Sequence, residues 1–260
     1  MIAEADREAH GPNPLCALAE GRSVIEYLSF KFWRTGLSNL APGQPHPVLV
    51  IPGFLASDSS TEPMRDLLKD LGYEVHGWGL GHNIRVDARR IEQLAEVLVR
   101  IFEEKGEPVS IIGWSLGGVF ARELARAMPD KVRMVISLGS PIDEDPRYSN
   151  VSPIFEAING SVEDLRQDAI PGHSRTPPPV PCTSVYTKTD GVVHWRGSLQ
   201  NIGEEAENVE VWASHTGLGF NPSVMVLIAD RLRQDPVHWQ PFVPKGWDRV
   251  IFPRPAIRAE

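Results

Sequence analysis

The sequence predicts an α/β fold, in which a mostly parallel central sheet is flanked by helices and carries a cap or lid insertion. The first observation is the alternation of short β-branched apolar segments with amphipathic ones along much of the 260 residues. The second is the continuous apolar run Val-Leu-Val-Ile at residues 48–51, which is typical of a parallel strand covered on both faces. The third is residues 87–105, whose apolar positions share one helical face and which end before Gly106.

The other elements follow the same alternation. Strands are predicted at residues 48–51, 73–78, 108–112, 132–138, 183–188 and 209–212, and helices at residues 62–71, 87–105, 119–128 and 222–233. Pro129 ends the third helix, and Pro222 suits the first turn of the last one. With 42% hydrophobic residues, the chain can bury the core of one domain. We therefore expect a single domain over residues 1–260, with its core at about 46–233.

Two segments stand apart from this alternation. Residues 14–40 predict an N-terminal helical extension packed on the core, with a membrane-surface helix as the weaker alternative. Residues from about 144 to 181 form an insertion, which we expect to lie as a cap over the carboxyl ends of the strands. Its apolar residues would line or cover a pocket, or else only plug the sheet edge; they include Ile154, Phe155, Ile158 and Leu165.

Composition and charge disfavour several classes of function. The formal net charge of −8 disfavours nucleic acid as a partner, and no apolar run is long enough to span a bilayer. The charged first residues lack the apolar region of a signal peptide, so we expect a cytoplasmic protein. Cys16 and Cys182 are too few for a disulfide framework and show no metal-binding spacing. Residues 77–82 are rich in glycine but lack the spacing of a dinucleotide-binding loop.

The motif that carries the chemistry is Gly-Trp-Ser-Leu-Gly-Gly at residues 113–118. A predicted strand precedes it and a predicted helix follows it, which is the context of a nucleophile elbow. Gly113 and Gly117 fit a sharp turn in which side chains would crowd the neighbouring strand and helix. The turn would expose Ser115 Oγ and place the Leu116 N–H at a helix N-terminus, where an oxyanion can form. The sequence therefore predicts Ser115 as a nucleophile.

A nucleophilic serine needs a base, and the base needs a group that orients it. Asp190 follows a predicted strand within Thr-Asp-Gly and is the preferred acid, although an aspartate that only caps its own turn would look the same. Asp143 is the rival and Asp145 a weaker one. His215 follows the last strand and precedes the closing helix, which is the position for the base; His194 and His238 are the fallbacks.

The second oxyanion donor should come from the loop after the first core strand. Phe54 N–H is the candidate, because Gly53 lets the backbone approach closely, and Leu55 is the alternative. We predict that the substrate contacts Trp114, Leu55 and Phe155.

Four motifs, in order from about His46 to Arg233, resemble the α/β-hydrolase superfamily, and more closely its bacterial serine esterases and lipases. Residues 113–118 resemble the elbow, residues 46–54 the first core strand with the oxyanion loop, residues 189–193 the acid turn, and residues 214–219 the histidine loop. The chain departs from the H-G-G-G branch, because no glycine run precedes the first donor.

The resemblance implies hydrolysis of a small-molecule carboxylic ester through an acyl-serine intermediate, with no cofactor and no metal. Ser115 would be the nucleophile, His215 the base and Asp190 the residue that orients the base. Acyl transfer, thioester or amide hydrolysis and cofactor-free haloperoxidation use the same three residues and remain alternatives. A non-catalytic binding protein of this fold is the alternative from another class.

Overall fold

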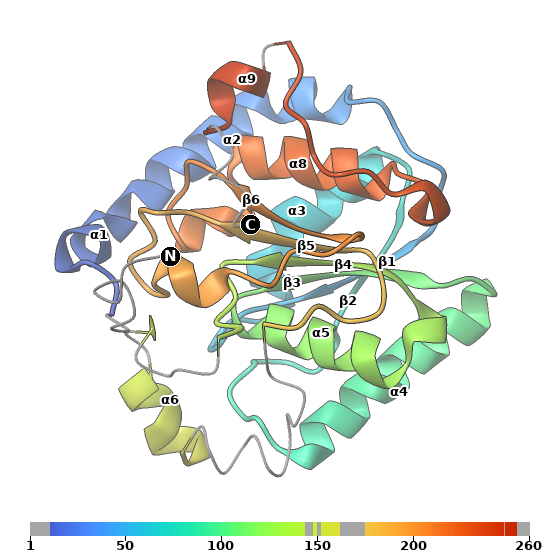
Figure 1. The fold of residues 1–260 in the computed structure, drawn as a ribbon, viewed down its shortest axis with the longest axis horizontal. Helices are drawn as coiled ribbons and strands as arrows, with labels where there is room; N and C mark the ends of the chain where they lie inside the picture. Colours follow the sequence, from blue (N-terminus) through green and yellow to red (C-terminus); the bar gives the residue numbers. More distant parts are fainter. Residues whose placement is uncertain (1–10, 144–147, 150–151, 162–174, 247, 254–260) are drawn as a thin grey trace.

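A parallel sheet forms the centre of the computed structural model, which describes residues 11–143, 148–149, 152–161, 175–246 and 248–253 (Figure 1). Its six strands lie in the order β2-β1-β3-β4-β5-β6, and every neighbouring pair is parallel. The strands are β1 (Pro47–Ile51), β2 (Glu74–Gly77), β3 (Val109–Trp114), β4 (Val132–Leu138), β5 (Cys182–Tyr186) and β6 (Ala206–Glu210). Each corresponds to a predicted strand, so the predicted α/β fold is confirmed.

Helices cover both faces of the sheet. In Figure 1, α2 (Ser23–Ser38), α3 (Asp58–Asp70) and α8 (Pro222–Leu232) lie above the sheet, and α4 (Ala88–Lys105) and α5 (Leu116–Ala127) lie below it. Alternate side chains of β1 enter the two cores. Val48 and Val50 join the cluster beneath α3 and α8, whereas Leu49 and Ile51 join the cluster formed with α4 and α5. This alternation explains why the strand is apolar throughout.

Local signals set the ends of the helices. Asp87 Oδ1 accepts the Arg90 N–H at 2.8 Å at the start of α4, and Gly106 ends that helix in the left-handed conformation at φ 72°. Helix α5 begins at Leu116, three residues before the predicted start at Val119. The prediction assigned Gly117 and Gly118 to the turn. A Cβ at Gly117 would collide with Ile51 O at the end of β1, and one at Gly118 would collide with Ser137 of β4, so the close packing of α5 on the sheet needs glycine inside the first helical turn.

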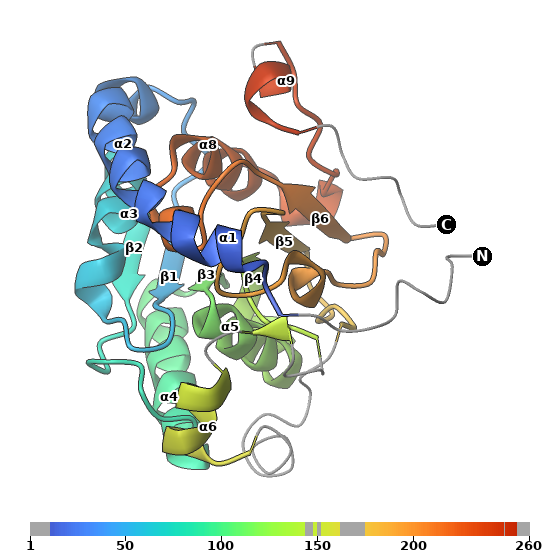
Figure 2. The same ribbon diagram turned by 90° about the vertical axis from the view of Figure 1, so that its left-hand side faces the viewer.

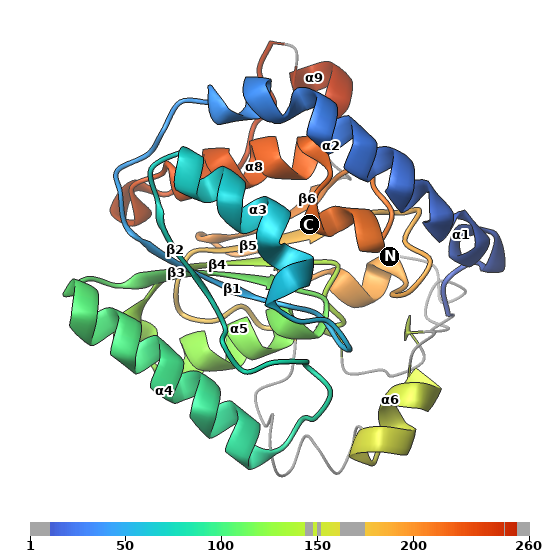
Figure 3. The same cartoon turned by 180° about the vertical axis from the view of Figure 1, so that it is seen from behind.

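The N-terminal extension consists of α1 (Pro14–Leu18), the 3-10 helix η2 (Ala19–Arg22) and α2. Helix α2 packs on α8 and α3, as Figures 2 and 3 show from two sides. Its inner face buries Phe30 and Leu37. The other large apolar side chains of the extension are mostly exposed, namely Leu15, Leu18, Val24, Ile25, Leu28, Phe32 and Trp33. No helix among the described residues is both long and apolar enough to cross a membrane.

Helix α6 (Ser152–Asn159) lies within the segment predicted to form a cap, on the same side of the sheet as α4 and α5 (Figure 2). The Phe155 ring packs edge-on against Phe54, with the ring centroids 5.3 Å apart. Asn159 Oδ1 accepts the Val86 N–H at 2.9 Å, which ties the helix to the segment before α4. Leu165 and Asp145 lie outside the described residues.

The remaining elements are short. They are the 3-10 helices η3 (Pro129–Lys131), η5 (Trp195–Ser198), η6 (Thr216–Gly219) and η7 (Pro236–His238), and the helix α9 (Asp248–Ile251). The C-terminal segment packs on the body through Trp239 and Phe252, both of which are buried.

Candidate active site

The backbone at Ser115 is strained, as a nucleophile elbow requires. Ser115 joins β3 to α5 with φ 53°, in the left-handed region that residues other than glycine rarely adopt. Its N–H donates to Leu138 O at 2.8 Å, which fixes the turn to the neighbouring strand β4. A Cβ at Gly113 would collide with the Gly117 backbone, and one at Gly117 would collide with Ile51 O. The turn therefore depends on glycine at both positions.

The structure brings Asp190 and His215 together. Asp190 lies in the loop after β5, where its Oδ1 accepts the N–H groups of Val192 and Val193, each at 2.8 Å. Its Oδ2 lies 2.7 Å from His215 Nδ1. Ser115, Asp190 and His215 are each at most 9% exposed. Two backbone donors thus hold the carboxylate so that its other oxygen faces the imidazole.

His215 lies beside the elbow. Trp114, which precedes Ser115, donates its Nε1–H to His215 O at 3.1 Å. At Gly139, a Cβ would come within 3.1 Å of His215 Nδ1 and 3.3 Å of Asp190 Oδ2, so this buried turn closes tightly over the pair. The prediction placed Trp114 among the substrate contacts. Trp114 as a residue is 9% exposed, and its indole N–H donates to His215 O.

Two carboxylates control the ionisation of His215. Burial lowers the pKa of the imidazole, but the charge of Asp190, the Asp190 hydrogen bond and the charge of Glu20 raise it, and the net pKa lies above the ordinary value. Burial raises the pKa of Glu20. Hydrogen bonds from the backbone N–H groups of Thr216, His215 and Gly191 lower it by more than burial raises it, so the pKa of Glu20 lies below its ordinary value. Glu20 is therefore ionised at neutral pH.

The rival residues have other partners. Asp143 forms an ion pair with Arg175, and its backbone N–H donates to Gly197 O at 3.0 Å. His194 stacks on Tyr148, with the ring centroids 5.6 Å apart. His238 is exposed and its Nδ1 lies 2.8 Å from Asp235 Oδ2.

The loop after β1 lies against Ser115. A Cβ at Gly53 would lie 3.2 Å from Ser115 Cβ, so the loop approaches the serine as closely as glycine permits. Leu55 has φ 63° and donates its N–H to Asn83 O at 2.8 Å. The Phe54 N–H donates no hydrogen bond within the described part of the chain. Leu116 is the first residue of α5, so its N–H has no acceptor within the helix.

Sequence reasoning missed two groups of residues near the site. Asn83 is fully buried, and its Nδ2 donates to Pro52 O at 2.8 Å, which supports the loop after β1. Glu20 and Arg22 of the N-terminal extension bind the loops that carry Asp190 and His215. No local signal marks either group, because an isolated polar residue in a loop or helix has many ordinary explanations.

Among the described residues, no cluster of three or more His, Cys, Asp or Glu side chains could hold a metal ion.

The sheet order, the elbow and the loops that follow the strands define an α/β-hydrolase-fold protein. Residues 46–158 match the sequence profile of the α/β hydrolase fold family. The predicted resemblance to this superfamily and its esterase- and lipase-like members is confirmed.

Among proteins of known activity, the chain is similar to a pimeloyl-[acyl-carrier protein] methyl ester esterase from Photobacterium profundum. The two are 29% identical over 121 residues, which cover 44% of this chain and 43% of that esterase. The chain thus matches less than half the length of this relative.

Two solved structures illustrate the likeness in fold. Aspergillus fumigatus lipase B aligns with a TM-score of 0.59 at 17% identity, covering 78% of this chain and 56% of that chain. A pyrethroid hydrolase from Sphingobium faniae aligns with a TM-score of 0.54 at 20% identity, covering 75% of this chain and 100% of that chain.

Proposed function

We propose that the protein hydrolyses carboxylic esters through an acyl-serine intermediate. The observation that carries the proposal is the buried Asp190–His215 pair, 2.7 Å apart, beside a serine held at φ 53°. Such a pair keeps the imidazole in one tautomer and stabilises the cation that forms when the imidazole takes a proton. The likeness to an esterase supports an ester as the first substrate to test.

The reaction has two halves. His215 takes the Ser115 proton while Ser115 Oγ bonds to the ester carbonyl carbon. The tetrahedral intermediate then expels the alcohol, which leaves with the proton from His215. Water next attacks the acyl carbon and gives up a proton to His215. The C–O bond to Ser115 then breaks, His215 returns that proton to Ser115 Oγ, and the carboxylic acid is released. Asp190 keeps its charge throughout and orients His215.

The developing oxyanion needs donors that are already in place. We propose the N–H groups of Phe54 and Leu116, because both lie next to the elbow and neither has an acceptor in the contacts described above. Leu55 is the weaker choice, because its N–H is engaged by Asn83 O. We also propose that Phe155, which packs on Phe54, contacts the acyl group and that α6 is part of a cap.

The test is a panel of chromogenic esters with increasing acyl length, assayed on the wild type and on Ser115→Ala, with and without acceptor alcohols. Ester hydrolysis supports the proposal if it is lost in Ser115→Ala. Transfer to the alcohol in preference to water would make the protein an acyltransferase. A panel in which neither protein turns over any ester would contradict the proposal.

A further inference from the structure

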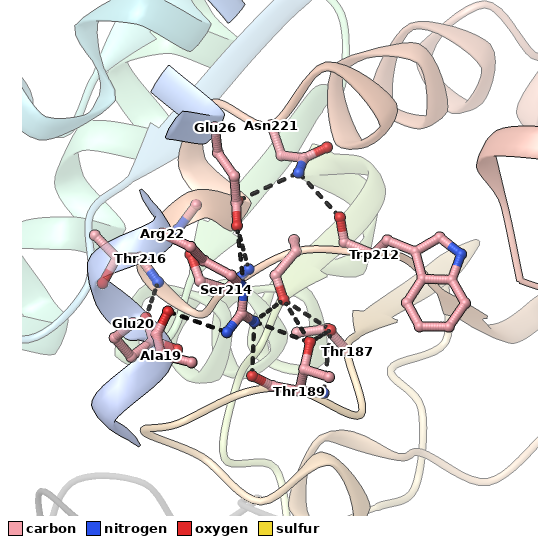
Figure 4. Close-up of polar contacts among 12 residues, drawn as sticks. Ala19, Glu20, Arg22, Glu26, Thr187, Thr189, Trp212, Ser214, Thr216 and Asn221 are labelled. Carbon is pink, nitrogen blue, oxygen red and sulfur yellow. Dashed lines mark hydrogen bonds and ion pairs between the residues drawn. The ribbon is translucent and has the colours of Figure 1, made fainter. Parts of the chain in front are cut away.

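The N-terminal extension makes polar contacts with both loops of the candidate active site (Figure 4). Glu20 accepts backbone N–H groups from each of them. Its Oε1 accepts from Gly191, next to Asp190, and from His215, both at 2.9 Å. Its Oε2 accepts from Thr216 at 3.0 Å. One carboxylate therefore connects the acid turn to the histidine loop.

Arg22 connects the same two loops through their acceptors. Its Nη2 donates to Thr189 O and to Ala213 O, both at 2.8 Å, and to Thr189 Oγ1 at 2.9 Å. Thr189 precedes Asp190, and Ala213 lies two residues before His215. Because Arg22 supplies donors where Glu20 supplies acceptors, the two side chains bind complementary backbone groups of one pair of loops.

The loops are shaped to receive the extension. A Cβ at Gly191 would lie 2.5 Å from Cys16 O, so the acid turn can approach the extension only with glycine there. A Cβ at Gly217 would collide with the Glu26 carboxylate, which accepts the Ser214 N–H at 2.8 Å. Both loops thus have glycine where any side chain would strike the extension, so the loops and the extension are complementary in shape.

We propose that Glu20 and Arg22 are positioning residues, which hold the Asp190 turn and the His215 loop in register with each other. The inference rests on the proposed function, because it assigns them a role in catalysis through His215. Neither residue touches the reacting atoms. Their effect is to keep the Asp190–His215 hydrogen bond short and the imidazole aimed in one direction, a geometry to which reaction rates are sensitive.

Charge gives Glu20 a second effect. Among the described residues, the charged groups at the two loops include Asp190 from the loop after β5, Glu20 from η2, Arg22 at the end of η2, and Glu26 from α2. Lys188, two residues before Asp190, pairs with Glu210 at 2.8 Å. Arg22 and Glu26 also pair with each other at 3.5 Å. The negative charge of Glu20 favours the protonated imidazole, so its removal should lower the pKa of His215.

The experiment compares Glu20→Gln and Arg22→Lys with matched controls elsewhere in the chain. Glu74→Gln removes a carboxylate that pairs with Lys105 at 2.6 Å on the edge strand β2. Arg34→Lys makes the same change as Arg22→Lys at a residue of α2 that pairs with Asp70 at 2.6 Å. We expect Glu20→Gln and Arg22→Lys to lower kcat by roughly ten- to hundredfold with KM little changed, and the controls to keep wild-type kinetics.

A second readout needs no turnover. The pKa of His215 is measured by NMR titration in the Ser115→Ala background, with and without Glu20→Gln. We expect Glu20→Gln to lower this pKa and Glu74→Gln to leave it unchanged. If no ester is hydrolysed and Glu20→Gln still lowers the pKa, the proposed function fails while the contact of Glu20 with the pair stands.

Thermal unfolding of each variant separates positioning from stability. Glu20→Gln and Arg22→Lys break different contacts to the same loops. If one variant fails to fold, the kinetics of the other variant still test the proposal. The proposal is overturned if the folded variants keep wild-type kcat and the His215 pKa does not move. It is equally overturned if the melting temperature alone changes.

Discussion

At the scale of single residues, the choice of the acid is the sharpest test of the site. Asp190 Oδ2 lies 2.7 Å from His215 Nδ1, whereas Asp143 pairs with Arg175. The sequence placed both aspartates after strands and could only prefer one of them. It could not show which carboxylate faces the imidazole, because that depends on how two loops pack.

We therefore expect Asp190→Asn to lower kcat by roughly 10⁴-fold, because an amide cannot stabilise the imidazolium or hold the same tautomer. Asp143→Asn serves as the matched control and should retain most of the activity. Steady-state kinetics on both variants decide the point. Damage from Asp143→Asn with a benign Asp190→Asn would show that the acid is misassigned.

The pH dependence follows from the ionisation of His215. A free imidazole titrates near about 6.5, and the pKa of His215 is raised above that value. Only the neutral imidazole can take the Ser115 proton, so activity is lost as the pH falls through the raised pKa. We expect the midpoint of the acidic limb of kcat/KM to lie above about 6.5. A limb that stays flat down to about pH 4 would argue against a histidine base.

At the scale of elements, the sequence predicted those helix and strand bounds that depend on local residue patterns. Strand β4 has the predicted bounds, and α4 begins one residue after the predicted start and ends before Gly106 as expected. The start of α5 was placed late, because a glycine pair suits a turn as well as a tightly packed helix. For the N-terminal extension, the pattern predicted helices but not which of their polar side chains face the candidate site.

Helix α6 is the part of the proposed cap that can be tested directly. Phe155 is half-buried against Phe54, and its neighbour Ile154 is 54% exposed and serves as the control. Trimming Phe155 to Ala should change the preference between short and long acyl chains by roughly ten- to two-hundredfold and spare a small acetyl ester, because lost pocket contacts weaken binding but not chemistry. Ile154→Ala should leave the profile unchanged.

The ester panel and the melting temperature are measured on both variants. If Phe155→Ala lowers the melting temperature and leaves the acyl-length profile as it was, α6 only covers the sheet edge and the cap proposal fails.

At the scale of the whole molecule, the fold brings together residues that the sequence keeps far apart. Parallel strands end at one edge of the sheet, so the loops with Ser115, Asp190 and His215 share that edge, and this could be predicted from order alone. The hydrogen bond between Glu20 and the His215 N–H joins residues 195 positions apart. No periodicity or motif encodes such a contact, so it became visible only in the folded chain.

The central claim is that Ser115 is a nucleophile activated by the Asp190–His215 pair. Labelling with a fluorophosphonate, followed by intact-mass and peptide analysis, tests it most directly, because the probe reacts with an activated serine without needing the natural substrate. We expect one adduct per chain on Ser115, slow labelling in His215→Gln and none in Ser115→Ala, with all three proteins folded. Wild-type protein that takes up no probe, or Ser115→Ala that takes it up equally well, would contradict the assignment of Ser115 as an activated nucleophile.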